Sequence, residues 1–318
     1  MKVSVVIPNF NGEAYLDNCL NSLYKQEYRE FEILVVDNGS KDRSLEVLEE
    51  HSSNIKIIEL KENLGFSRAC NEGSKAASGE LVVLLNNDTL ATPEWLGSLV
   101  SCIERDNKIF SCCSKMLRFN EKELIDDAGD EYNIFGWSYK RGDGNPKATH
   151  ELKDRSVFSS CAGAAIYRKS ILLELGGFDE SFFAYLEDID LSYRALIHGY
   201  KNIYCSKAEV YHVGSATSGS RYNQFKARLT AKNNFLVIYK NMPLLQLIFN
   251  LPFIALGFLI KYLFYDKKGL GKAYKEGIVL GFKGIKTSKK VAFRLKNIKN
   301  YLKIQLLLIK NVFVMVKG

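Results

Sequence analysis

The stretch Leu81-Val-Val-Leu-Leu-Asn-Asn-Asp-Thr89 begins with five apolar residues and turns abruptly polar. The apolar run, with β-branched Val82 and Val83, predicts a buried strand of a parallel sheet. In an open α/β sheet, ligands bind at the carboxyl ends of the strands. A carboxylate flanked by amides suits a divalent cation that bridges phosphate oxygens, which makes Asp88 a candidate metal ligand. The alternative is that Asp88 closes a turn or caps a helix expected to open at Pro93.

Strands and helices are expected to alternate four times in the first hundred residues. Such alternation is typical of a parallel sheet that is covered on both faces by helices. The pattern weakens between Ile109 and His150, where we expect long functional or mobile loops, including one over Asp126–Asp130. The expected strands are Val3–Ile7, Ile33–Val36, Ile55–Leu60, Leu81–Leu85, Ile203–Cys205 and Val210–His212; the expected helices are Ala14–Gln26, Ser44–Glu50, Phe66–Ala77, one from Pro93, Ser170–Leu175 and Asp188–His198.

Charge is unevenly distributed along the 318 residues. From Arg221 onward there are 20 Lys or Arg and only two acids, a net charge of +18, whereas the first 220 residues carry a net charge of −10. A mildly acidic domain followed by a basic, apolar region suggests two environments. Nucleic acid and an anionic membrane surface are both candidate partners of the basic part.

The seven cysteines show no Cys-x-x-Cys spacing and the four histidines are scattered, so the sequence carries no zinc signature. The odd number of thiols suits a reducing compartment. Because Met1-Lys2-Val3 enters a strand at once, no signal peptide is expected, and we expect the catalytic part to be cytoplasmic.

Polar residues also follow the first two strands, at Pro8–Asn11 and Asp37–Ser40. Asp37 could accept a hydrogen bond from a base or a ribose, as carboxylates do in nucleotide-binding sheets. The alternative is a pair of turns that cap the following helices. The chain has no Gly-x-Gly-x-x-Gly after the first strand and no phosphate-binding loop of the Gly-x-x-x-x-Gly-Lys-Ser/Thr type. These absences argue against a dinucleotide dehydrogenase and a P-loop enzyme.

The segment Gly176–Arg194 places five acids among aromatic residues. Glu187 and Asp188 are expected at a helix start, where the helix dipole favours ionised carboxylates, and Asp188 could act as a general base. The alternative is a helix cap plus an ion pair between Asp190 and Arg194. His212, at an expected strand end, is more often a buried imidazole than a ligand unless a metal lies nearby.

Taken in order, these motifs resemble an inverting family-2 glycosyltransferase with the GT-A fold, of the branch that includes bacterial rhamnosyltransferases. The resemblance runs from Val3 to about Ser218. It rests on Val-Val-Ile-Pro-Asn-Phe-Asn-Gly12, Val-Val-Asp-Asn-Gly-Ser-Lys-Asp42, Glu-Asn-Leu-Gly-Phe66, Asn71-Glu-Gly73, Leu-Leu-Asn-Asn-Asp-Thr89, Gly-Gly-Phe-Asp-Glu180, Glu-Asp-Ile-Asp190 and His-Val-Gly-Ser215.

The resemblance implies a role for each matching residue. Asp188, beside Glu187, would be the base, and Mg²⁺ or Mn²⁺ would be bound by Asp88 and His212. The family often has acids where this chain has Asn86 and Asn87, which leaves Asp88 as the one carboxylate of that motif. The loops around Trp137 and Arg141 would meet the acceptor. The nucleotide-sugar would be bound by Pro8, Asn9, Phe10, Asn11, Asp37, Asn38, Asn63, Gly65, Asn71, Asn87 and Asp88.

The C-terminal region contains an uncharged stretch from Asn241 to Ile260. Twenty helical residues span about 30 Å, the thickness of a hydrocarbon core, but two prolines, Gln246 and Asn250 argue against a clean span. Further on, lysines recur at helical spacing beside Ile and Leu, which is typical of a cationic amphipathic helix on an anionic leaflet. The alternative is a helical bundle that packs on the catalytic domain or on a partner. Nucleic acid is the least favoured partner, because the lysines alternate with long aliphatic runs.

The sequence therefore predicts an α/β GT-A domain over residues 1–220 and a basic, apolar helical region over 221–318. The expected function is transfer of a sugar from dTDP-rhamnose or a UDP-sugar to a lipid-linked or surface-polysaccharide acceptor, at the cytoplasmic face of the membrane. The alternative is a non-catalytic nucleotide-sugar-binding subunit of a membrane-bound glycan assembly complex.

Overall fold

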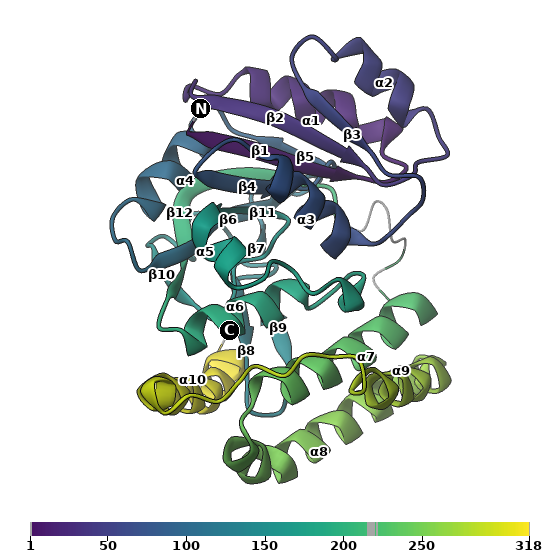
Figure 1. Cartoon of the computed structure of the whole chain (residues 1–318), viewed down its shortest axis with the longest axis vertical. Coiled ribbons are helices and arrows are strands. Elements are labelled where there is room, and N and C mark those ends of the chain that lie inside the picture. Colours follow the sequence, from purple (N-terminus) through teal and green to yellow (C-terminus); the bar gives the residue numbers. More distant parts are fainter. Residues whose placement is uncertain (1, 215–219, 221, 318) are drawn as a thin grey trace.

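Strand β4 (Leu81–Leu85) lies inside the main sheet of the protein, with parallel β1 on one side and antiparallel β11 on the other. The computed structural model describes residues 2–214, 220 and 222–317, so Ser215 of the last motif and Arg221 lie outside the described part. The sheet has the order β10-β12-β6-β11-β4-β1-β2-β3, and β5 and β7 pair with β12 and β6. The expected α/β class with a mostly parallel sheet is confirmed, and Figure 1 shows helices packed along it.

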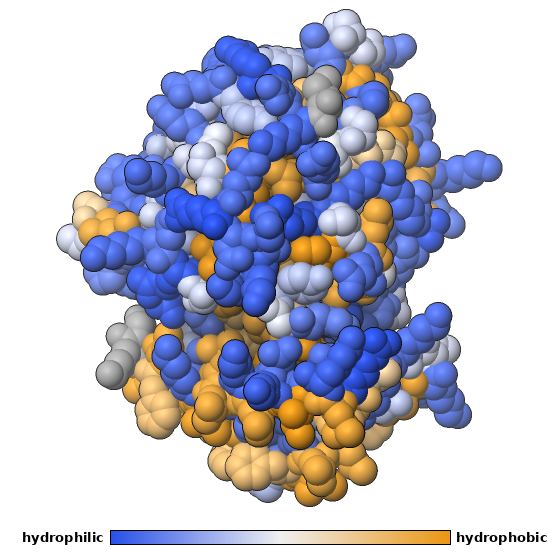
Figure 2. All heavy atoms as spheres, turned by 60° about the vertical axis from the view of Figure 1, so that its left-hand side comes forward, coloured by the Kyte–Doolittle hydropathy of each residue, from blue (hydrophilic) through white to orange (hydrophobic). Residues whose placement is uncertain are grey.

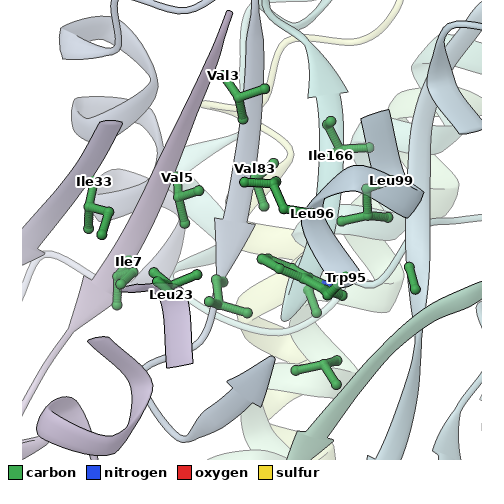
Figure 3. Packing of buried hydrophobic residues seen from close by; sticks show 14 of the residues in the cluster. Val3, Val5, Ile7, Leu23, Ile33, Val83, Trp95, Leu96, Leu99 and Ile166 are labelled. Atoms are coloured by element: carbon green, nitrogen blue, oxygen red, sulfur yellow. The ribbon is translucent and has the colours of Figure 1, made fainter. Parts of the chain in front are cut away.

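The first half of the chain alternates as expected. Its elements are β1 (Val3–Asn9), α1 (Glu13–Tyr24), β2 (Phe31–Asp37), α2 (Ser44–Glu50), β3 (Lys56–Glu59), α3 (Phe66–Ala76), β4, β5 (Thr89–Ala91) and α4 (Trp95–Ile103). One core lies between the sheet and α1 and α4, where Trp95, Leu96 and Leu99 pack toward Val83 and Ile166 (Figure 3). Each such buried side chain contributes about 1.5–3 kcal/mol of transfer free energy.

Two expectations around Pro93 are wrong. The helix begins at Trp95, and the residues after Asp88 form strand β5, whose Thr89 lies opposite His212 of β12. Asp88 therefore does not cap a helix at Pro93, but the other half of that alternative is right, because Asn87 and Asp88 lie in the turn between β4 and β5. The pairing instead brings Asp88 beside the end of β12.

The expected loop over residues 109–150 is largely wrong up to Lys140 and right beyond it, since residues 141–150 form no helix or strand. Ile109–Arg118 is strand β6, buried between β11 and β12, and short strands follow at β7 (Ile125–Asp127), β8 (Asp130–Tyr132) and β9 (Ser138–Lys140). The apolar pattern of β6 is interrupted by Ser111 and Ser114, which are fully buried because each bonds internally. Ser111 Oγ donates to Asn202 Oδ1 over 2.9 Å and Ser114 Oγ donates to the Ala164 carbonyl over 2.8 Å.

Residues 2–214 form the part expected to be catalytic, called the catalytic half below. Its remaining elements are β10 (Arg155–Val157), β11 (Ala164–Arg168), α5 (Lys169–Glu174), a 3₁₀ turn η1 (Glu180–Phe182), α6 (Glu187–Ile197) and β12 (Lys201–His212). The two short strands expected near its end are one strand, β12, whose register against β6 shifts between Cys205 and Glu209. The segment Cys161–Ala165, whose small residues predict close backbone approach to a ligand or a packed helix, leads into β11 against β4.

The basic region folds into helices α7 (Gln224–Asn241), α8 (Leu244–Lys267), α9 (Gly271–Gly284), a 3₁₀ turn η2 (Leu295–Asn297) and α10 (Ile298–Lys317). They lie at the opposite end of the molecule from β1–β3 (Figure 1). Leu236, Ile254 and Leu308 of these helices share one core with Phe182 and Tyr193 of the catalytic half. The helices therefore pack on the catalytic half, as expected under the alternative of a helical bundle.

These helices also keep an apolar outer surface. Within the described residues, α8 alone is long and apolar enough to cross a membrane, and only 17% of its most apolar 18 residues are buried. Pro252 lies inside this helix. Figure 2 shows apolar side chains gathered at this end of the molecule, below a mostly hydrophilic surface. The large exposed side chains include Leu244, Leu245, Ile248, Phe249, Leu256, Leu259 and Leu263 of α8, Val279 and Phe282 of α9, and Leu302, Leu306, Phe313 and Val316 of α10.

Candidate active site

The polar residues at the ends of β4, β1 and β2 form a buried hydrogen-bonded row. Asn87 Nδ2 donates to Asn9 Oδ1 over 2.6 Å, and Asn9 Nδ2 donates to Asp37 Oδ1 over 2.8 Å. Ser40 donates to both oxygens of Asp37, from Oγ over 2.6 Å and from its backbone N–H over 3.0 Å. The sheet order β4-β1-β2 thus brings together the three strand ends that the sequence placed at one edge.

The loop after β1 is tied to the loop after β2. Asn11, exposed and at a φ of 51°, receives the Lys41 N–H at its Oδ1 and donates its own N–H to Ser40 Oγ. Pro8 and Phe10 beside it are half-buried. These residues frame the row at the edge of the sheet where a nucleotide is expected.

A second group of expected donor residues meets beyond β2. Asn38 Nδ2 donates to Asn63 Oδ1 and to the Gly65 carbonyl, over 3.1 and 3.2 Å, and Asn38 Oδ1 receives the Leu64 N–H. Gly65 has a φ of +91°, and a Cβ there would lie 2.6 Å from the Phe183 carbonyl oxygen, so only glycine fits.

Asn71 lies apart from this group and braces the turn before α6. Its Nδ2 donates to the Phe178 carbonyl and to Glu180 Oε1, and its Oδ1 receives the Phe178 N–H. Both ends of this amide are therefore used within the protein.

The expected metal ligands Asp88 and His212 face each other. His212 Nε2 lies 3.5 Å from Asp88 Oδ1, and the Val213 N–H donates to the Asp88 carbonyl. On its other side, His212 Nδ1 lies 2.7 Å from Asp126 Oδ2, and Asp126 Oδ1 accepts from Lys140 Nζ over 3.0 Å. Burial lowers the pKa of His212, but the bonds to Asp126 and Asp88 outweigh it and raise that pKa to about 9.

This donor set fits a divalent cation. A carboxylate oxygen and an imidazole nitrogen converge, both side chains are largely buried, and oxygens of a bound diphosphate would complete the coordination. The neighbouring Asn87 is held in the row by the bond from its amide nitrogen to Asn9.

Glu187 and Asp188 open α6 as expected, but their protonation differs from the expectation. Burial, together with the charge of Asp188, raises the pKa of Glu187 to about 8, and burial also raises the pKa of Asp188. The helix N-terminus does not compensate, since Glu187 Oε2 has no hydrogen-bond partner among the described residues. Asp188 accepts the Ile189 N–H at Oδ1 over 2.8 Å and the Ala162 N–H at Oδ2 over 3.4 Å.

The ion-pair alternative for this segment is right for Asp190. This fully buried carboxylate accepts from Arg194, from Lys240 Nζ over 3.0 Å and from Asn241 Nδ2 over 2.9 Å. Burial would raise the pKa of Asp190, but the charges of Arg194 and Lys240 lower it. Helix α6 therefore carries one structural carboxylate, Asp190, and two carboxylates with raised pKa at its start.

Sequence reasoning missed a cluster of acids near Asp188. Burial raises the pKa of Asp127 to about 6, and burial with the charges of Asp127 and Asp188 raises that of Asp130 well above its usual range. Cys161 lies within 4.8 Å of both carboxylates. The sequence does show three acids within the five residues Asp126–Asp130. Because this stretch was expected to be a loop, nothing predicted that their side chains would lie close together.

Trp137 and Arg141, expected to meet the acceptor, bind within the protein. Trp137 Nε1 donates to the Gly257 carbonyl of α8 over 3.1 Å, and Arg141 lies between Glu131 and Glu151 at 3.2 and 3.3 Å. Another possible metal group, formed by Cys102, Asp154 and Cys205, is remote in the fold, and Asp154 there is already bound to Arg105 and Ser206.

A family model described as "Glycosyl transferase family 2" matches residues 4–176, more than half of the chain. The chain belongs to glycosyltransferase family 2. The matched residues include the row at the strand ends and also Asn38, Asn63, Gly65 and Asp88. Asp188 and His212 lie beyond the matched residues.

Curated relatives of this family-2 glycosyltransferase include an uncharacterized glycosyltransferase of Haemophilus influenzae, 34% identical over 49% of this chain and 47% of the relative. The O-antigen chain rhamnosyltransferase RfbN of Salmonella typhimurium is 25% identical over 71% of this chain and 70% of RfbN. The chain spans about half the length of the first of these relatives, and less of several others.

Solved structures share the fold of this family-2 glycosyltransferase. GalNAc-T7 with UDP, GalNAc and Mn²⁺ superposes with a TM-score of 0.63 at 19% identity, over 76% of this chain and 48% of that one. The mannosyltransferase PcManGT from Pyrobaculum calidifontis with GDP-Man and Mn²⁺ gives 0.57 at 16% identity, over 96% and 84%. The GT-A fold is thereby confirmed.

Proposed function

We propose that this protein is an inverting glycosyltransferase that moves a sugar from a nucleoside-diphosphate sugar to a hydroxyl of a lipid-linked or surface-polysaccharide acceptor. One observation carries the proposal. The Asn86 N–H donates to the Gly163 carbonyl over 2.8 Å, and the neighbouring Ala162 N–H donates to Asp188. The carboxylate of Asp188, whose pKa is raised, is thus separated only by residues 162–163 from the end of β4, which leads to Asp88.

In the proposed reaction, Asp188 accepts the proton of the acceptor hydroxyl. The hydroxyl oxygen forms a bond to the anomeric carbon on the face opposite the diphosphate, the bond from that carbon to the diphosphate oxygen breaks, and the configuration inverts. Mg²⁺ or Mn²⁺, held by Asp88 and His212, would neutralise the charge that develops on the leaving diphosphate. Glu187, protonated at neutral pH by its raised pKa, adds no second charge beside the base.

The donor side is supported by the polar row and the Asn38 group. We propose that Pro8, Asn9, Phe10, Asn11 and Asp37 hold the nucleoside, with Asn38, Asn63, Gly65 and Asn87 beside it and Asn71 bracing the pocket from behind. The name of the rhamnosyltransferase RfbN supports a rhamnosyl donor, such as the dTDP-rhamnose expected from the sequence, and the neighbours hold UDP or GDP-Man within the same fold.

The acceptor side is supported by the outer surface of α8–α10. Leu245, Leu306 and Val316 are 83%, 68% and 79% exposed, and exposed apolar surfaces of this kind mark interaction sites. Lysines flank them on α9 and α10. We propose that this surface lies on the cytoplasmic, anionic leaflet of the cell membrane, within reach of a lipid-linked acceptor.

The test uses the full chain with Mn²⁺ and a panel of nucleotide-sugars, with and without membranes that supply an acceptor. Release of nucleoside diphosphate from one donor is expected, and Asp188→Asn should lower transfer by about a hundred- to ten-thousandfold. Binding of the nucleoside diphosphate by Asp188→Asn should remain. Absence of release from every donor would instead support the non-catalytic subunit.

A further inference from the structure

The segment that leads into α6 has an unusual backbone. Phe183, Tyr185 and Leu186 have φ values of 65°, 71° and 65°, although none is glycine. Residues with side chains rarely adopt such angles, and they keep them only where the surroundings hold them. The segment ends directly at Glu187 and Asp188, so its conformation fixes where α6 begins.

One side chain from the basic region holds this segment. Asn233 of α7 donates from Nδ2 to the carbonyls of Phe182, Ala184 and Tyr185, over 3.0, 2.8 and 2.7 Å. Asn233 is fully buried. Three carbonyls that converge on one amide nitrogen fix the direction of three of the four peptide units from Phe182 to Tyr185. They hold the backbone at positive φ values that residues with side chains disfavour.

Contacts on both sides of the segment come from the same helix. Lys240 binds Asp179 before it and Asp190 after it, and Asn241 binds Asp190 as well. On the far side, the Ser67 N–H donates to the Phe183 carbonyl over 3.3 Å, beside Gly65. The segment therefore lies between the donor pocket and α7.

We propose that Asn233 is a positioning residue that sets the place of Asp188, and this inference rests on the proposed role of Asp188 as the base. Without the three bonds, the backbone from Phe183 to Leu186 relaxes toward negative φ and shifts the first turn of α6. A displacement of about 1 Å at a catalytic group lowers a rate by about a hundredfold. Donor binding should change much less than kcat, because Asn38 and the row at Asn9 bond to one another and not to Asn233, and among the described donor residues only Gly65, at the edge of the pocket, meets the segment.

The test compares Asn233→Ala with Asn234→Ala in the full chain. Asn234 is a buried asparagine of the same helix, but its Oδ1 accepts from Tyr132, away from the segment. Both variants lose buried hydrogen bonds, so similar losses of thermal stability are expected. Asn233→Ala alone should lower kcat, by about a hundredfold, and keep the donor KM within about twofold.

Amide hydrogen exchange of residues 182–189 gives a second readout that needs no turnover. Exchange should be faster in Asn233→Ala than in Asn234→Ala, and Asn233→Ser, which keeps one donor, should fall between the alanine variant and the wild type in both exchange and kcat. If Asn233→Ala does not fold, the serine variants at the two positions provide the same comparison.

Equal kcat in the two alanine variants, or equal exchange, would overturn the inference. Failure of the proposed function looks different. In that case the wild-type chain would release no nucleoside diphosphate, or Asp188→Asn would keep its turnover, whereas the exchange rates would still show whether Asn233 holds the segment.

Discussion

His212 Nδ1 lies 2.7 Å from Asp126 Oδ2, while its Nε2 faces Asp88 Oδ1 at 3.5 Å. The carboxylate of Asp126 thereby fixes the orientation of the imidazole and decides which nitrogen is presented to Asp88. Groups that orient a ligand in this way commonly contribute to metal affinity without touching the ion.

Asp126→Ala should therefore weaken Mn²⁺ binding by about ten- to a hundredfold, because the imidazole loses its orienting partner. Calorimetric titration of Mn²⁺ in the presence of nucleoside diphosphate measures the change. Glu121→Gln is the control, since Glu121 is an exposed acid whose ion pair is with Arg118 and not with His212 or Asp88. Unchanged Mn²⁺ affinity in Asp126→Ala would contradict the assignment of His212 as a ligand.

The buried acids predict a decrease of stability as pH rises. With a folded-state pKa of about 8 against an ordinary 4.5, Glu187 keeps its proton in the folded protein at pH values where the unfolded chain has lost it. The free energy of unfolding should fall between about pH 4.5 and 8, by up to about 1.4 kcal/mol per pH unit from this group. Asp127, with a pKa of about 6, adds to the fall at the lower end of that range.

Glu187→Gln should flatten this slope and raise stability at pH 8, because the glutamine carries no proton to lose. Urea unfolding at several pH values measures it, with Glu49→Gln on the exposed face of α2 as the control. A slope unchanged by Glu187→Gln would mean that Glu187 ionises normally.

Charges placed on the outer face of α8 should prevent membrane binding. Leu245 and Phe249 are 83% and 59% exposed, so the double variant Leu245→Glu, Phe249→Glu should fold normally. Each side chain that inserts contributes about 1.5–3 kcal/mol, and the affinity for anionic vesicles should fall at least tenfold. Sedimentation with vesicles measures the loss.

Leu152→Glu is the matched control, since Leu152 is 55% exposed on the catalytic half. The wild-type chain should stay bound at high salt, which screens the lysines but not the apolar contact. Failure of the wild-type chain to sediment at low salt would contradict the membrane proposal and favour a protein partner for this face.

Two glycines should respond oppositely to alanine. A Cβ on Gly12 would lie 2.2 Å from both Asn87 Nδ2 and Asn9 Oδ1, so Gly12→Ala should break the row, lower stability by about 1–3 kcal/mol and weaken donor binding. In α4, a Cβ on Gly97 would lie 3.9 Å from Tyr28, and Gly97→Ala should raise stability by up to about 1 kcal/mol. Chemical unfolding and nucleoside-diphosphate binding distinguish the two, and intact binding in Gly12→Ala would count against the row.

The sequence predicted the elements whose stability comes from uninterrupted apolar runs. Leu81–Leu85 was predicted with its observed bounds, because every residue of β4 is apolar and buried. The β6 strand was missed, since Ser111 and Ser114 are buried through hydrogen bonds to residues far along the chain, which periodicity does not reveal.

The candidate site likewise has a part that the sequence predicted and a part that it did not. The strand ends that carry Asn9, Asp37 and Asn87 were expected to lie together, because parallel strands end at one edge of a sheet. The partners Asp126 and Asn233 were not foreseen, since each acts on its neighbour across a long stretch of sequence, 86 residues in the case of Asp126 and His212. Burial also reversed the expected ionisation of Glu187, which no local pattern encodes.

The basic region is part of the same folded body as the catalytic half, because the two share one core that contains Phe182, Tyr193, Leu236, Ile254 and Leu308. The first of its helices also supplies Lys240 and Asn241 to Asp190, within the helix that carries Asp188. Residues 224–317 are thus not a modular anchor. Grafting them onto another member of the family would replace one wall of its catalytic half together with the partners of Asp190.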